Sequence, residues 1–114
     1  MTARNPLLGA TPYQVEAALK KLGADLKTAR LRRNLTIEEA ARKIGTSRFT
    51  VADAEKGKPS TGVAVYAALL WVYGLIDRVS DLADPGKDEE GMQLALAREP
   101  ARAGRSGGKL SNDF

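Results

Sequence analysis

Hydroxyl-bearing and cationic side chains recur between residues 36 and 58, and their chemistry suits an anionic partner. Such groups hold phosphate oxygens by hydrogen bonds and charge, without reading a base sequence. The candidate phosphate contacts are Thr36, Lys43, Thr46, Thr50, Lys56 and Lys58. Thr36 and Thr46 are equally suited to capping helices, so the role of their hydroxyls stays open between the two.

Catalytic chemistry finds little support in the 114 residues. The chain has no His and no Cys, which removes the commonest general base, thiolate zinc sites and disulfides. The glycine-rich stretch GRSGGK, residues 104–109, neither follows a predicted strand nor opens a predicted helix, as a phosphate-binding loop would. We therefore expect no catalytic residue, no metal and no cofactor, and an enzyme is the poorest interpretation.

The net charge of +4 is unevenly distributed along the chain. Residues 20–58 carry eleven Lys or Arg against five Asp or Glu, whereas residues 76–99 carry three against seven. Charged runs are most often solvated faces, but a basic excess on the phosphate-binding candidates favours a nucleic-acid partner. No apolar run has the length of a membrane span and no signal-peptide core is present, so we expect a cytoplasmic, nucleoid-associated protein.

A short helix is predicted at residues 37–44. Thr36 followed three residues later by Glu39 has the spacing of a capping box. The apolar residues of this stretch recur at i, i+3, i+4 and i+7, which places them on one helical face. Gly45 stands where a helix end favours a left-handed residue.

A second helix is predicted at about residues 47–56. Ser47 supplies a capping hydroxyl at its start, and Gly57 follows its end. Val51 and Ala54 are its inward residues. Two helices joined by a short glycine-containing turn form a helix-turn-helix unit, whose second helix can enter a DNA groove.

Three further helices complete an all-α fold. One long helix is expected over residues 12–33, capped by Thr11 and carrying Gly23 at a cost of about 1 kcal/mol relative to Ala. The strongly apolar residues 63–73 predict a helix buried on more than one side, and residues 75–83 predict a fifth helix. The apolar stripe of the long helix consists of Val15, Leu19, Leu22, Leu26 and Ala29.

Shorter segments flank the predicted domain, which spans residues 12–83. Residues 1–11 are expected to form a flexible arm, and residues 84–99 a short acidic helical extension. Residues 100–114 are rich in Arg, Gly and Ser without a core-forming pattern, so we expect a disordered tail.

The stretch LTIEEAARKIGTSRFTVADAEKGKPS, residues 35–60, resembles the helix-turn-helix domains of Cro and the phage repressors, the XRE family. The resembling positions hold Thr36, Glu39, Ala40, Ala41, Gly45, Ser47, Val51, Glu55 and Gly57. The resemblance covers about residues 22–82. It implies a five-helix Cro/C1-type domain, here with an extended first helix, that binds double-stranded DNA.

The resemblance also implies which side chains face the major groove. They are Ser47, Arg48, Phe49, Ala52 and Asp53. Arg48 is the best base reader because its fork matches the two acceptors of guanine, and Phe49 can touch a thymine methyl. Asp53 departs from the Gln, Arg or Ser usual in the family. Its carboxylate can accept from cytosine, or can instead restrain Arg48 or another partner, so base specificity stays open here.

Two further contacts are implied by the resemblance. Arg30 and Glu55 would form a structural ion pair between the first helix and the recognition helix; the alternative is two ordinary surface charges. Helices after the recognition helix often build a dimer interface in the family. The candidate interface residues are Trp71, Leu75, Ile76 and Val79, which could equally belong to the intramolecular core. A two-fold homodimer would read a palindromic operator.

The stretch from residue 82 onwards is similar to the end of antitoxins that accompany HipA-type kinase toxins. The resembling residues are Leu82, Ala83, Asp84, Pro85, Asp88, Glu89 and Gly91. The likeness implies a repressor that autoregulates its operon as a type II antitoxin and binds its toxin through the C-terminal region. The alternatives are a stand-alone XRE-type regulator and a protein-interaction module with degenerate DNA binding.

Overall fold

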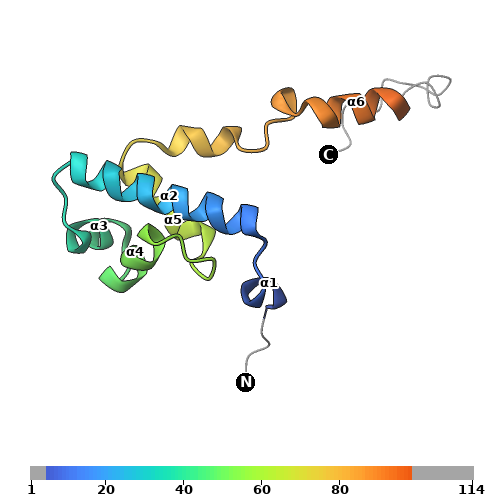
Figure 1. Ribbon diagram of the computed structural model, residues 1–114. Helices are drawn as coiled ribbons and strands as arrows, with labels where there is room; N and C mark the ends of the chain where they lie inside the picture. The colour runs from blue at the N-terminus through green and yellow to red at the C-terminus, as the bar shows by residue number, and fades with distance from the viewer. Residues whose placement is uncertain (1–4, 99–114) are drawn as a thin grey trace. The chain divides into compact units, whose positions relative to one another are not determined.

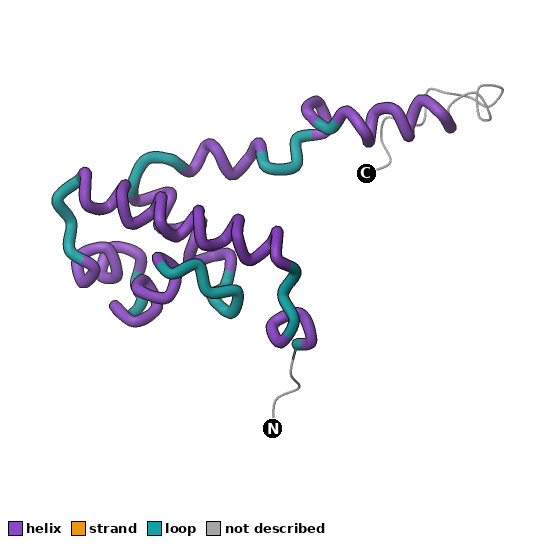
Figure 2. The backbone as a smooth tube through the Cα atoms, viewed as in Figure 1, coloured by secondary structure: helices purple, strands orange, loops and turns teal. Residues whose placement is uncertain are grey.

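The computed structural model describes residues 5–98, and all regular structure within them is helical (Figures 1 and 2). The α-helices are α1 Pro6–Gly9, α2 Tyr13–Arg32, α3 Ile37–Ile44, α4 Arg48–Glu55, α5 Val63–Val72 and α6 Glu89–Arg98; the 3-10 helices are η1 Ile76–Asp81 and η2 Pro85–Lys87. The expected all-α class is confirmed. The chain divides into two compact units, one ending at Val79 and one beginning at Ser80, which are described separately.

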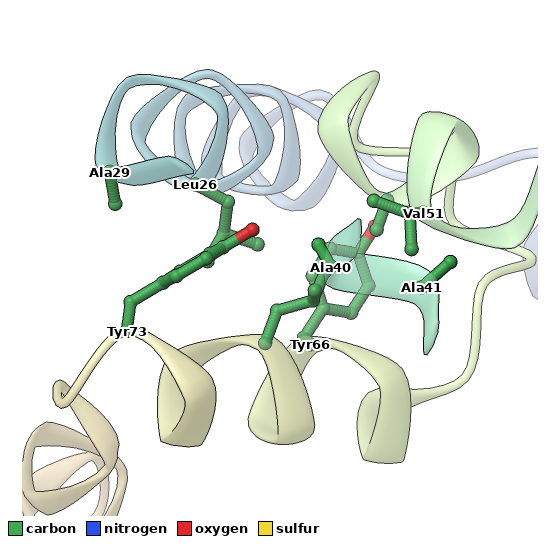
Figure 3. Close-up of a cluster of buried hydrophobic side chains, with 9 residues drawn as sticks. Leu26, Ala29, Ala40, Ala41, Val51, Tyr66 and Tyr73 are labelled. Carbon is green, nitrogen blue, oxygen red and sulfur yellow. The ribbon is translucent and has the colours of Figure 1, made fainter. Parts of the chain in front are cut away.

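The core of the first unit lies between α2, α3, α4 and α5. Helix α2 packs on α4, and α3 packs on both α4 and α5. The largest fully buried side chains are Leu26, Val51 and Leu69, one each from α2, α4 and α5. The buried alanines of α3, Ala40 and Ala41, face this cluster (Figure 3). Because alanine is small, α3 can approach its two neighbours closely.

Local signals set the ends of α3. Thr36 and Glu39 form the predicted capping box: the Thr36 Oγ1 accepts from the Glu39 N–H at 3.0 Å, and the Glu39 Oε1 accepts from the Thr36 N–H at 2.8 Å. Gly45 ends the helix with φ of +78°, a conformation that a Cβ would penalise. The Thr46 N–H then bonds the Ala41 carbonyl at 3.0 Å, which turns the chain towards α4.

Gly23 marks the place where α2 crosses the end of α4. A Cβ added at Gly23 would lie 2.6 Å from the carbonyl oxygens of both Ala54 and Glu55, closer than real Cβ contacts. The glycine therefore allows the two backbones to approach, and its helix-propensity cost is accepted in exchange for that contact. Gly57, with φ of +71°, lies against the backbone of Leu19 and Lys20 in the same crossing.

The start of α2 differs from the prediction. Thr11 does not cap it: Pro12 holds the N-cap position without a side-chain bond, and the Thr11 hydroxyl donates to the Leu7 carbonyl at 2.9 Å. The expected arm also contains the short helix α1, capped by the Asn5 side chain. Val15 is exposed because the buried residues of α2 begin only at Gly23, where α4 crosses.

The end of the first unit also differs. Gly62 holds the N-cap position of α5, which has no side-chain capping bond. The fifth predicted helix, residues 75–83, is instead the 3-10 helix η1. Its apolar residues Ile76 and Val79 lie three apart, a spacing that a 3-10 helix aligns on one side.

The second unit contains η2 and α6, which pack together. Asp84 accepts from the Gly86 N–H and Asp88 from the Gly91 N–H, each at 2.9 Å, so each carboxylate satisfies a backbone donor at the start of a helix. The large apolar side chains of α6, Met92, Leu94 and Leu96, are exposed. The tail predicted at residues 100–114 lies outside the described residues. Within residues 5–98, no helix combines the length and apolarity that a membrane crossing requires.

Candidate nucleic-acid interface

Helix α4 presents one face to the core and the other to solvent. Val51 and Ala54 are completely buried on its inner face. Arg48 and Phe49 are exposed in its first turn, and the Phe49 side chain is 66% exposed although it is large and apolar. Exposed side chains in the first turn of a helix can reach base edges in the major groove, where Arg can pair with guanine and Phe can touch a thymine methyl.

Two hydroxyl side chains, those of Ser47 and Thr50, lie at the N-terminus of α4. The Ser47 Oγ accepts from the Thr50 N–H at 3.2 Å and lies 3.2 Å from the Thr50 Oγ1. Ser47 therefore acts as the N-cap, with Thr50 completing the turn. A hydroxyl that accepts from a backbone N–H keeps its own proton to donate, so capping and a phosphate contact are compatible.

Arg48 is held by two contacts within the chain. Its Nη1 donates to the Glu38 Oε2 at 3.2 Å, and its Cζ lies 5.0 Å from the centre of the Phe49 ring. Glu38 stands in the first turn of α3, so the ion pair joins the two helices of the helix-turn-helix unit. The backbone N–H of Glu38 and then the Arg48 guanidinium lower the pKa of the Glu38 carboxyl, which is therefore ionised near neutral pH.

Asp53 pairs with Lys58, whereas the ion pair of Arg48 is with Glu38. The Asp53 Oδ1 lies 3.3 Å from the Lys58 Nζ, and the Asp53 carbonyl accepts from the Lys58 N–H at 3.2 Å. The Tyr66 hydroxyl donates to the Lys58 carbonyl at 3.1 Å. These bonds fix the loop after α4, and the carboxylate offsets the charge of one phosphate candidate.

The remaining phosphate candidates lie on the surface around α3 and α4. Lys43 and Lys56 are exposed at the ends of the two helices, and Thr46 is half-buried in the turn between them. Thr36 is exposed but engaged in its capping box. The structure thus brings the predicted cations and hydroxyls to the ends of α3 and α4, with acidic partners at Arg48 and Lys58.

Arg30 and Glu55 connect α2 to the end of α4. The Arg30 Nε donates to the Glu55 Oε2 at 2.6 Å and its Nη2 to the Glu55 Oε1 at 3.1 Å, while its Nη1 bonds the Leu35 carbonyl at 2.9 Å. Both side chains are buried, with exposed fractions of 7% and 6%. The hydrogen bond to Glu55, opposed by burial, raises the Arg30 pKa, so the guanidinium keeps its charge. A bidentate buried pair sets the position of α4 relative to α2.

The four dimer candidates differ in exposure. Trp71 is 62% exposed on α5, whereas Leu75, Ile76 and Val79 are half-buried. Leu75 also packs against the core of its own chain. Trp71 is thus the member of the set with the most surface to offer a partner.

Two positioning features are not predictable from the sequence pattern. In the sequence Glu38 is one charge among several in the basic stretch, and its contact with Arg48 spans ten residues, beyond any helical period. From the sequence alone, Gly23 is a residue that lowers helix propensity. The structure shows that a glycine is needed there because α2 and α4 cross with their backbones in close contact. Among residues 5–98, no group of three or more His, Cys, Asp or Glu side chains is arranged to hold a metal ion.

The comparisons with known proteins agree with this geometry. A family model described as a helix-turn-helix domain matches residues 21–82, which includes α3, α4 and α5. Among curated proteins, none matches the chain.

Proposed function

The chain belongs to the helix-turn-helix domain family, and on that premise we propose that it is a sequence-specific repressor that binds double-stranded DNA through α4. The observation that carries this proposal is the first turn of α4, where Arg48 and Phe49 are exposed on a helix whose opposite face is completely buried. Arg48 would contact guanine, and Ser47, Thr50, Lys43 and Lys56 would hold phosphates.

A selection from a random duplex pool tests the proposal. The wild-type protein should enrich a defined sequence, and its affinity should fall steeply as salt rises because bound counterions are released. Arg48→Ala should lose about 1–3 kcal/mol of discrimination for that sequence. Lys43→Ala should weaken all duplexes alike. A protein that binds no duplex in dilute buffer would refute DNA binding and leave the interaction-module alternative.

Lys21→Ala is the matched control for charge. Lys21 is exposed on α2 and pairs with Asp25 at 2.7 Å, so its removal lowers the net charge by one, as Arg48→Ala does. The preferred sequence and its discrimination should be unchanged in this variant. A loss as large as that of Arg48→Ala would mean that total charge, and not the Arg48 contact, governs selection.

We further propose a homodimer that reads a palindromic operator. Two recognition helices about one DNA turn apart, roughly 34 Å, would contact successive half-sites. The exposed Trp71 supports an interface at the end of α5, together with Leu75, Ile76 and Val79. Trp71→Glu should convert the dimer to a monomer in sedimentation velocity. Val63→Glu, on an exposed apolar residue at the other end of α5, should leave the dimer intact.

A second candidate role is that of a type II antitoxin whose C-terminal unit binds a HipA-type kinase. The observation that favours it is α6, which exposes Met92, Leu94 and Leu96 in a unit separate from the DNA-binding one. The test is co-expression with the product of a neighbouring kinase gene. Co-purification that is lost in Leu94→Asp/Leu96→Asp supports the role, while a chain without such a neighbour or complex is a stand-alone regulator.

A further inference from the structure

The ion pair between Glu38 and Arg48 crosses the turn of the helix-turn-helix unit on its solvent side. The two side chains are 57% and 58% exposed, with 3.2 Å between Oε2 and Nη1. Exposed ion pairs contribute about 0–1 kcal/mol to stability. The main effect of this pair is therefore on the position of the Arg48 guanidinium, not on the stability of the fold.

Two contacts restrict Arg48 before any ligand arrives. Glu38 holds the Nη1 atom, and the Phe49 ring lies beneath the guanidinium with 5.0 Å between Cζ and the ring centre. An unrestrained arginine side chain carries about 2 kcal/mol of rotamer entropy, part of which is lost on binding. The guanidinium has five N–H donors, so a bond from Nη1 to Glu38 leaves donors for a base edge.

Building on the proposed DNA-binding function, we propose that Glu38 is a positioning residue that directs Arg48 to base edges and opposes its transfer to phosphates. If Arg48 swung to a phosphate, the Glu38 carboxylate would lose its cation and face the anionic backbone. That arrangement is unfavourable because the like charges repel. At a matching site, Arg48 can contact guanine while it keeps Glu38 as a partner. Glu38 therefore weakens non-specific binding more than specific binding, and so contributes to selectivity.

Glu38→Gln tests this assignment because it removes the charge and keeps the length of the side chain. The probes are the duplex enriched by the wild-type protein and an unrelated duplex of equal length. We expect the affinity ratio between them to fall about fivefold, which corresponds to about 1 kcal/mol, the upper end of what an exposed ion pair contributes. On the unrelated duplex, log affinity against log salt should steepen by about 0.9, the contribution of one further phosphate contact.

A double-mutant cycle with Arg48→Ala separates positioning from a general charge effect. If Glu38 acts through Arg48, then Glu38→Gln should change neither selectivity nor salt slope once Arg48 is absent. Asp25→Asn is the matched control, because it removes one exposed carboxylate from the Lys21 ion pair on α2. Its affinity ratio should equal that of the wild type. Thermal melts followed by circular dichroism verify that each variant is folded.

The outcomes separate the inference from the function on which it rests. A wild-type protein that binds no duplex refutes the proposed function itself. A wild-type protein that selects a sequence, with Glu38→Gln selecting it equally well at the same salt slope, overturns only the role of Glu38. The role alone is also overturned if the effect of Glu38→Gln persists without Arg48. A wild type that binds every duplex equally refutes sequence-specific binding, and the role of Glu38 with it.

Discussion

The Nε of Arg30 lies 2.6 Å from the Oε2 of Glu55, and this buried pair joins residues 25 positions apart in the sequence. Arg30 closes the last turns of α2, and Glu55 ends α4. The Arg30 Nη1 donates to the carbonyl of Leu35, in the turn that leads to α3. One side chain therefore fixes three segments of the DNA-binding unit relative to one another.

Removing one charge of this pair should be strongly destabilising. Glu55→Gln leaves the Arg30 guanidinium buried without a counter-charge, and we expect a loss of about 3 kcal/mol in the free energy of unfolding. Urea denaturation measures it. Asp25→Asn, in the exposed pair with Lys21, should cost no more than about 1 kcal/mol. Equal effects of the two substitutions would contradict a structural role for the buried pair.

Gly23→Ala should destabilise the protein although alanine is the better helix former. The added Cβ would lie 2.6 Å from the Ala54 and Glu55 carbonyl oxygens, so α2 and α4 must separate. We expect a net loss of about 2 kcal/mol in thermal or urea unfolding, as for an overpacked core. Gly9→Ala is the control, because a Cβ added at Gly9 would meet nothing within 4 Å. A stabilised Gly23→Ala variant would show that the crossing is looser than described.

Removal of the Tyr73 hydroxyl and removal of the Tyr66 hydroxyl should change the stability of the protein in opposite directions. The Tyr73 Oη is buried without a hydrogen-bond partner among the described residues, whereas the Tyr66 hydroxyl donates to the Lys58 carbonyl. Tyr73→Phe should therefore keep or raise stability by about 1 kcal/mol, and Tyr66→Phe should lower it by about 1 kcal/mol. Chemical denaturation of both variants at neutral pH checks this pair.

Alkaline pH should reveal the burial of Tyr73. Burial, reinforced by the Glu55 charge, raises the pKa of Tyr73 above its ordinary value. In the unfolded chain the phenol loses its proton near pH 10, while the folded protein retains it. Stability should thus fall as pH rises above about 10, until the folded-state pKa is passed. Tyr73→Phe should lack this component, so its advantage over the wild type should grow with pH; a constant difference would contradict the prediction.

Asp53→Asn should strengthen DNA binding without changing the preferred sequence. The substitution releases Lys58 from the carboxylate 3.3 Å away, which frees a cation for a phosphate. We expect several-fold tighter binding of all duplexes and a salt slope steeper by about 0.9. Asp25→Asn controls for net charge. An altered selected sequence would instead assign Asp53 to base reading.

The helix-turn-helix unit is predictable from the amino-acid sequence because its signals act within one or two turns. Thr36 and Glu39 satisfy each other three residues apart, Gly45 adopts the left-handed turn, and Val51 and Ala54 repeat at helical spacing. Such patterns lie within a few neighbouring residues, and they suffice to predict the all-α class, whereas the outward-facing residues of α4 are inferred from the family resemblance.

The partners in each ion pair and the close contact between helix backbones depend on tertiary structure. Glu38 meets Arg48 across ten residues because the packing of α3 on α4 brings them together, whereas Asp53 pairs with Lys58 through the turn that ends α4. Gly23 becomes a requirement only because α4 crosses over it, and the stretch after Gly74 tightens into a 3-10 helix. Periodicity reports which face is buried, but the partner of that face depends on the packing of the whole unit.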